Sequence, residues 1–302
     1  MGKITVIGSF NIDLVCKVPT PPIPYDTIWG EDFLLTTGGK GSNQAICASR
    51  LGAEVYFIGC VGKDIFGEIA KNTLTKEKVN IDYLFEEQYS TGVAMVLVDK
   101  NNGDNTLIVC PEANQKLTPD SIDKAFEIIT NSDVVLIQFE IPIGTVEYVI
   151  EKLKDRTKPK LIVNPAPAKK LRKEVWNNLY IVTPNKRELE LLSDIKIDSQ
   201  DDLIKASKKL LSWGIQNVIV TLGERGAFLM NKNEIVEVPA LKVNPVDTTG
   251  AGDAFNGGLA VALSEGIDLV NAIKFANKVA GLKVQKYGAS SMPYKEELEK
   301  LI

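Results

Sequence analysis

The chain has 302 residues, of which 44% are hydrophobic and 25% are charged, and its formal net charge is −4. This composition is typical of a globular enzyme with a large core, and the thinly spread Lys and Arg argue against a nucleic-acid or membrane-surface partner. The sequence contains no histidine, which excludes a Ser-His-Asp triad, a Cys-His pair and any histidine-ligated zinc.

Short runs rich in Val and Ile recur along the chain and predict buried strands at 3–9, 54–62, 133–140, 159–165, 179–185 and 217–223. Segments with helical periodicity lie between most of them, including 121–131, 145–154, 201–213 and 254–265. Apolar strands that alternate with helices indicate an α/β fold, a doubly wound and mostly parallel sheet flanked by helices. We found no linker or repeat, so a single domain is expected over 1–302.

Two segments, 18–37 and 90–111, break this alternation and read as antiparallel strands with no helix between them. The second is predicted to turn around residues 101–104. Together they suggest a small β-sheet, a discontinuous lid over approximately 12–38 and 90–111. Such a sheet could be a lid, a dimer surface or both, and the alternative is a hairpin extension of the main sheet.

The four cysteines are widely separated and form no C-x-x-C pair, which favours a reducing compartment. The N-terminal sequence enters a strand pattern directly, and no apolar run approaches the roughly 18 residues that span a bilayer. A cytoplasmic protein is therefore expected, with no membrane partner.

Polar residues follow the predicted strands, for example Asn11, Asp13, Glu140 and Asn164. Ligands of open α/β sheets bind at the carboxyl ends of the strands. Polar residues are common in any loop, but their presence after most of the successive strands favours one shared cleft.

The stretch Gly38-Gly-Lys-Gly-Ser superficially matches a nucleotide phosphate loop. That motif requires a glycine five residues before Gly39, where this chain has Leu34, and a Ser or Thr after Lys40, where it has Gly41. The stretch instead predicts a glycine turn into a helix over 42–51, with Lys40 and Asn43 near a ligand. A purely structural turn would explain the glycines but not these two side chains.

A second glycine-rich stretch, Asp247-Thr-Thr-Gly-Ala-Gly-Asp253, leads into another predicted helix. Small residues there leave backbone N–H groups free for an anion, and Asp253 is placed to accept a proton from an attacking hydroxyl. The alternative is that Asp253 merely caps a helix. The dinucleotide fingerprint G-x-G-x-x-G fails, because Phe255 replaces its third glycine.

These two motifs, with Asn11-Ile-Asp13, Asn164-Pro-Ala-Pro-Ala and Asn185-Lys-Arg-Glu188, resemble the ribokinase family of carbohydrate kinases from Gly8 to Pro293. The resemblance implies ATP-dependent phosphorylation of D-ribose at O5, a preference supported by Gln138-Phe-Glu140. Two alternatives remain: a kinase of the same family acting on deoxyribose, fructose or adenosine, and a catalytically silent sugar-binding regulator.

The resemblance also implies roles for the matched positions. The sugar would be bound by Asn11, Asp13, Gly39, Lys40, Asn43, Glu140 and Asp253. Asp253 would be the general base, with Gly250, Ala251 and Gly252 as the anion hole. ATP and its Mg²⁺ would be held by Asn185, Glu188, Thr221, Gly223, Gly226, Gly252 and Asn277.

A monovalent cation, expected to be K⁺, would be bound by side chains of Asp247 and Ser291 and by carbonyls of Thr249, Lys283 and Gly288. A homodimer through the lid strands is also implied. One position departs from the family pattern, because Glu112 stands where family members usually have glycine. Its carboxylate could alter sugar choice, or it could simply face solvent.

Overall fold

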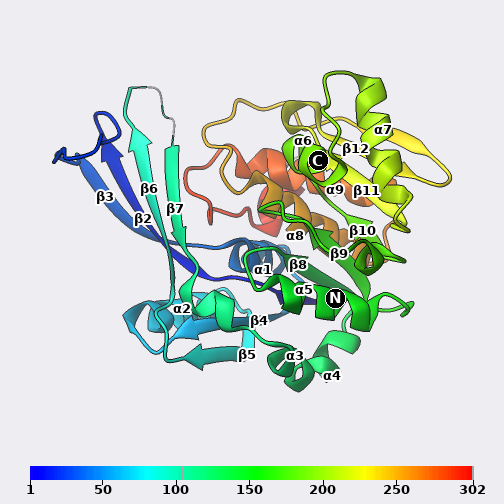
Figure 1. The fold of residues 1–302 in the computed structure, drawn as a ribbon, viewed down its shortest axis with the longest axis horizontal. Coiled ribbons are helices and arrows are strands. Elements are labelled where there is room, and N and C mark those ends of the chain that lie inside the picture. Colours follow the sequence, from blue (N-terminus) through cyan, green and yellow to red (C-terminus); the bar gives the residue numbers. More distant parts are fainter. Residues whose placement is uncertain (102, 104, 301–302) are drawn as a thin grey trace.

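A computed structural model describes residues 1–101, 103 and 105–300 and contains two sheets (Figure 1). The larger sheet has nine strands in the order β13-β12-β11-β10-β9-β8-β1-β4-β5. Their bounds are β1 (Lys3–Ile7), β4 (Glu54–Gly62), β5 (Asn80–Glu87), β8 (Val134–Gln138), β9 (Lys160–Asn164), β10 (Ile181–Val182), β11 (Asn217–Thr221), β12 (Ala227–Asn231) and β13 (Ile235–Val238). From β5 to β11 neighbouring strands are parallel, whereas β12 and β13 pair antiparallel.

Helices cover both faces of the larger sheet, so its central strands are buried on both sides. One face packs against α1 (Lys40–Arg50), α2 (Ile65–Lys76), α8 (Ala251–Ser264), α9 (Leu269–Lys283) and α10 (Lys295–Glu299). The other packs against α3 (Pro119–Lys124), α4 (Phe126–Thr130), α5 (Ile143–Leu153), α6 (Lys186–Ser193) and α7 (Gln200–Leu211). The predicted doubly wound α/β class is confirmed.

The smaller sheet has four strands in the order β3-β2-β6-β7, and we call it the second sheet. Its strands are β2 (Asn11–Val18), β3 (Asp32–Gly38), β6 (Gly92–Asp99) and β7 (Asn105–Cys110). It projects to one side of the helix-covered body (Figure 1). Within the described residues none of its strands pairs with the larger sheet, so it is not a hairpin extension of that sheet.

The prediction of purely antiparallel strands in this second sheet was wrong for its central pair. β2 and β6 run parallel, with Asp13 opposite Ala94, because the larger-sheet strand β4 and helices α1 and α2 intervene between them in sequence. Only β2–β3 and β6–β7 pair antiparallel. In the predicted turn at 101–104, residues 102 and 104 lie outside the described part of the chain.

Two helix predictions also differ from the structure. The segment 121–131 forms two short helices, α3 and α4, separated at Ala125 with φ −98° and ψ 4°. Helix α1 begins at Lys40, two residues before the predicted start. Among the described residues, no helix is long and apolar enough to cross a membrane.

Candidate active site

The start of α1 is packed directly against the loop that follows β1. Gly39 has φ 94°, and a Cβ atom there would lie 2.9 Å from the backbone nitrogen of Asn11, so only glycine fits without strain. This close approach places the backbone nitrogen of Lys40 2.9 Å from Oε2 of Glu140, to which it donates. Ser9 Oγ donates to the same carboxylate oxygen. Glu140 is thus held at the N-terminal end of α1.

Asp253 lies in the first turn of α8 and is 6% exposed. Its carboxylate accepts hydrogen bonds from Gln44 Nε2 at 3.0 Å and Asn43 Nδ2 at 3.2 Å. Burial raises the pKa of Asp253, while the Lys40 ammonium and these amides oppose the shift. A carboxylate with a raised pKa is a better proton acceptor near neutral pH.

The other amide atoms of these two side chains differ in their bonding. Gln44 Oε1 accepts from Gln138 Nε2 at 2.6 Å. Asn43 Oδ1 is buried and has no hydrogen-bond partner among the described residues. A buried acceptor without a partner costs free energy, and a ligand hydroxyl could satisfy it.

The backbone before α8 forms one wall of a cavity of about 150 Å³, which we call the inner cavity. Gly250 has φ 79° at the helix N-cap, and a Cβ on Gly252 would meet nothing within 4 Å. The cavity is lined by Gly250, Ala251, Gly252 and Asp253, and by Lys40, Asn185, Glu188 and Thr221. The free N–H groups of a helix start and a lysine make this cavity suitable for an anion.

Lys40 is surrounded by acidic groups. The carboxylate of Asp253 raises the pKa of the Lys40 ammonium, burial opposes this shift, and Glu140 and Glu188 reinforce it. The sequence predicted Lys40 at the sugar, and the structure places it on the same cavity wall as Gly250–Gly252.

Asn185 and Glu188 form a capping box at the start of α6. Asn185 Oδ1 accepts from the Glu188 backbone nitrogen, and Glu188 Oε2 accepts from the Asn185 backbone nitrogen, both at 2.8 Å. Burial raises the pKa of Glu188. Oxygen donors beside an anion cavity fit a hydrated Mg²⁺, which binds few protein ligands directly.

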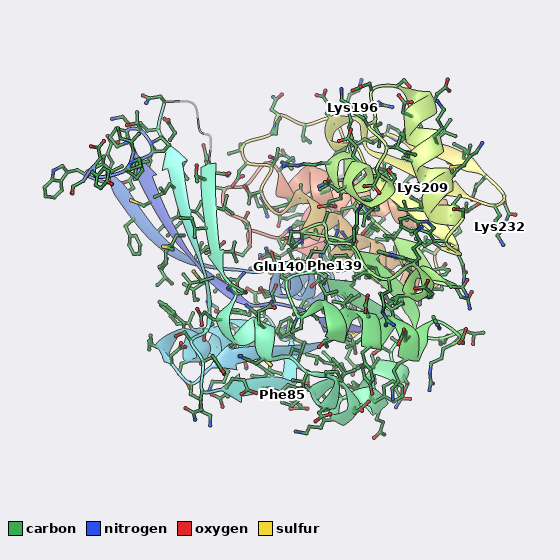
Figure 2. All side chains as sticks on the ribbon, in the orientation of Figure 1. Phe85, Phe139, Glu140, Lys196, Lys209 and Lys232 are labelled. Carbon is green, nitrogen blue, oxygen red and sulfur yellow. The ribbon has the colours of Figure 1, made fainter. Side chains whose placement is uncertain are left out.

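A second, larger cavity of about 290 Å³ lies beside Glu140, and we call it the outer cavity. Figure 2 shows Glu140 and Phe139 near the middle of the molecule, at the side of the body from which the second sheet projects. The wall of the outer cavity includes Asn11, Asn114 and Val109 of β7. Asn114 Nδ2 donates to Asn11 Oδ1 at 2.8 Å, which fixes the orientation of the Asn11 amide.

Asp13 is on the same face of the second sheet as Val109. Asp13 of β2 pairs with Ala94 of β6, and Ala94 pairs with Val109 of β7, so the three residues lie side by side across the sheet. Burial, with a further contribution from Glu140, raises the pKa of Asp13 to about 7. A carboxyl with this pKa can both donate and accept hydrogen bonds near neutral pH.

Not all residues predicted at the nucleotide lie on a cavity wall. Thr221 lines the inner cavity. Gly223 and Gly226 form a turn closed by a bond of 2.9 Å from Gly226 N to Gly223 O. Asn277 is buried and donates to the carbonyls of Val238 at 2.9 Å and Pro239 at 3.0 Å.

The residues predicted to bind a monovalent cation lie at the end of α9, at Lys283, and in two loops that contact one another, but they are bonded among themselves. The carboxylate of Asp247 accepts from the backbone nitrogens of Thr249 and Gly288, both at 2.8 Å. Ser291 Oγ donates to the Gly288 carbonyl at 2.7 Å. Lys283 directs its ammonium group, and not only its carbonyl, toward these loops.

Sequence reasoning placed Asn164 in the shared cleft but gave no role to Gln44, Thr183 or Asn256, which hold the site in place. Gln44 also donates to Asn164 Oδ1 at 3.1 Å, and Asn164 Nδ2 donates to the Thr183 carbonyl at 3.2 Å. Thr183 Oγ1 donates to Asn256 Oδ1 at 2.7 Å. The one signal in the sequence for a role of Gln44 was its place directly after Asn43 in the first glycine motif.

The chain belongs to the pfkB family of carbohydrate kinases, whose family model matches residues 1–296. The predicted family and the predicted carbohydrate kinase activity are thereby confirmed. The ribokinase of Bacillus subtilis (strain 168) is 38% identical over 304 residues, covering 100% of both chains. The deoxyribokinase of Salmonella typhi is 35% identical over 290 residues, 95% of this chain and 94% of that protein.

A solved structure of Arabidopsis thaliana ribokinase complexed with ribose and ATP superposes with a TM-score of 0.91. Its sequence is 30% identical, and the match covers 99% of this chain and 98% of that chain. The architecture described above, including the second sheet, is therefore that of a known carbohydrate kinase fold.

Proposed function

We propose that the protein transfers the γ-phosphoryl group of ATP to O5 of D-ribose and releases ribose 5-phosphate and ADP. The observation that carries this proposal is Asp253, a buried carboxylate oriented by Asn43 and Gln44 and adjacent to the helix start at Gly250–Gly252. In the proposed step the C5 hydroxyl oxygen bonds to the γ-phosphorus while the bond to the bridging oxygen of ADP breaks. The hydroxyl proton passes to Asp253.

The sugar would occupy the space between Asp253 and the outer cavity. Asn11, Asp13, Glu140 and the unpartnered Asn43 Oδ1 are polar groups of the kind that sugar hydroxyls require. Gly39 allows the sugar to approach the backbone. A site that hydrogen-bonds each hydroxyl discriminates strongly against analogues that lack one.

The triphosphate would bind in the inner cavity. The N–H groups of Gly250 and Gly252 and the Lys40 ammonium would stabilise the transferred phosphoryl group, while Ala251, whose N–H donates to the Thr248 carbonyl at 3.1 Å, would line the anion hole. Asn185 and Glu188 would hold the waters of Mg²⁺, which neutralises phosphate charge when bound. Thr221, Gly223, Gly226 and Asn277 are proposed on the nucleotide side, with Asn277 acting through the chain at Val238.

2-Deoxyribose is the alternative acceptor, because one relative is the deoxyribokinase of Salmonella typhi, but the more similar Bacillus subtilis ribokinase and the ribokinase structure with ribose and ATP favour ribose. A panel of ribose, 2-deoxyribose, fructose and adenosine with MgATP tests the proposal by comparing kcat/KM. We expect ribose to give the highest value. A higher value for 2-deoxyribose would reassign the acceptor, and sugar binding without phosphorylation of any acceptor would identify a silent regulator.

We also propose a homodimer formed through the second sheet. Apolar side chains are exposed on it, including Phe33 at 69% and Ile108 at 52%, and large exposed apolar patches mark interaction sites. Ile108 lies on the face opposite Val109, because successive strand residues point to opposite faces. Sedimentation of Ile108→Glu should show a monomer where the parent sediments as a dimer, and a parent monomer would refute the proposal.

A cytoplasmic location is part of the proposal. All four cysteines are free, which suits a reducing compartment. The cytoplasm also supplies ATP, the proposed phosphoryl donor.

A further inference from the structure

Lys283 is a lysine with no exposure to solvent, at the last position of α9. Lysine is almost never fully buried unless its ammonium group is paired. Lys283 lies beside the loops that were predicted from the sequence to bind a monovalent metal ion.

The Lys283 ammonium is paired with main-chain oxygens of these loops. Nζ donates to the Asp247 carbonyl at 3.3 Å and to the Lys286 carbonyl at 3.2 Å. Burial lowers the pKa of the ammonium, and the carboxylates of Asp247 and Asp253 oppose that shift by favouring the charged form. The lysine therefore brings a cation to carbonyl oxygens, the donor type that K⁺ also prefers.

The predicted metal ligands do not fit a second cation here. Each carboxylate oxygen of Asp247 accepts one backbone N–H group, from Thr249 or Gly288, and the Ser291 hydroxyl donates to the Gly288 carbonyl, but lone pairs remain on these oxygens, so the misfit comes from charge. A metal ion between the same loops would lie next to the Lys283 ammonium and be repelled by it. The structure and the predicted K⁺ site therefore disagree.

The two loops connect Lys283 to the start of α8. A Cβ atom on Gly250 would lie 2.4 Å from the Ala289 carbonyl oxygen, so the two backbones are in direct contact. Ala251, the first residue of α8, donates its N–H to the Thr248 carbonyl at 3.1 Å. Any shift of loop 247–249 would therefore displace the backbone N–H groups at Gly250–Gly252.

We propose that the Lys283 ammonium takes the place of the monovalent metal ion in this chain, as a built-in cation that holds loop 247–249 against residues 286–289. Lys283 is then a positioning residue for the anion hole. This inference rests on the proposed function, because the positioned N–H groups matter through their contact with the phosphoryl group. It makes the enzyme independent of K⁺.

The test compares KCl with tetramethylammonium chloride, whose cation is too large for a carbonyl site, at equal ionic strength. For the unmodified protein we expect kcat to agree within about twofold and the melting temperature to be unchanged between the salts. A tenfold stimulation by KCl, or a rise in melting temperature specific to KCl, would overturn the inference. The melting arm decides the question even if no sugar is phosphorylated.

Lys283→Ala removes the ammonium and opens space for an external cation. We expect kcat to fall at least tenfold in tetramethylammonium chloride and to recover largely in KCl or NH4Cl, with a matching recovery of the melting temperature. Lys278→Ala, an exposed lysine of the same helix, should behave as the parent in every salt. A folded Lys283→Ala protein with parent activity in all salts would refute the positioning role, and if this variant does not fold, the salt comparison on the parent still decides.

Discussion

The two walls of the candidate site are built differently. On the body side, Gln44, Asn164 and Asp253 are buried and joined by hydrogen bonds. On the side of the second sheet, apolar residues on the same face as Asp13, such as Leu34 and Leu107, remain exposed. The difference indicates that the reacting groups are held rigidly by the body, while the second sheet has surface that a ligand or a second copy would cover. Catalytic groups benefit from such preorganisation.

The largest expected effect comes from breaking the body wall at Asp253. Asp253→Asn should lower kcat about 10²–10⁴-fold, the usual contribution of a general base, because the amide cannot accept the hydroxyl proton. The dissociation constant for ribose, measured by calorimetry, should change only a few fold. Asp201→Asn, at an exposed position of α7, is the control and should keep parent turnover. Turnover of Asp253→Asn within threefold of the parent would remove this residue from the base role.

Glu140 lies where the two walls meet. Glu140→Ala should weaken ribose binding about 10–100-fold, the range expected for lost hydrogen bonds to a charged group, with a smaller change in kcat. Calorimetric titration with ribose measures this effect, and Glu127→Ala, at an exposed position of α4, is the control. An unchanged dissociation constant would show that Glu140 does not contact the sugar.

Asp13 tests the wall formed by the second sheet through pH. Its pKa is about 7 in the folded protein against an ordinary value of 3.8, so the folded state binds its proton more tightly. Its contribution to the free energy of unfolding is therefore full below about pH 4 and is lost as the pH rises toward 7. Asp13→Asn should raise the free energy of unfolding by up to about 4 kcal/mol at pH 8 and leave it nearly unchanged at pH 4. Urea titrations at both pH values measure this, and an equal effect at both would contradict the assignment.

The smallest expected effect concerns Glu112, which follows the second sheet in sequence. It adopts φ 45°, a left-handed conformation that is unfavourable for residues with a Cβ atom, and it is exposed. Glu112→Gly should raise the free energy of unfolding by up to about 1 kcal/mol, because glycine relieves this strain but loses more chain entropy on folding. Glu112→Ala keeps the Cβ and should show no such gain. Equal melting temperatures for the Gly and Ala variants would argue against strain at this position.

The strand-forming runs were readable from the sequence because buried parallel strands need continuous apolar residues, as in Val134–Gln138. The two glycine motifs were readable because helix starts next to ligands need small residues at fixed spacing. The break between α3 and α4 was not readable, because alanine, which stands at the break at Ala125, is the strongest helix former and marks no helix end.

By itself the sequence determined the α/β class, the carbohydrate kinase family and the candidate base at Asp253, because these depend on local patterns of hydrophobicity and glycine. Only the tertiary structure decided that β2 and β6 pair in parallel, that Gln44 orients Asp253, and that the ammonium group of Lys283 reaches the Asp247 carbonyl. Each of these joins residues at least 36 positions apart in the chain. Local sequence patterns carry no information about such contacts, because the packing of the whole fold determines which distant atoms meet.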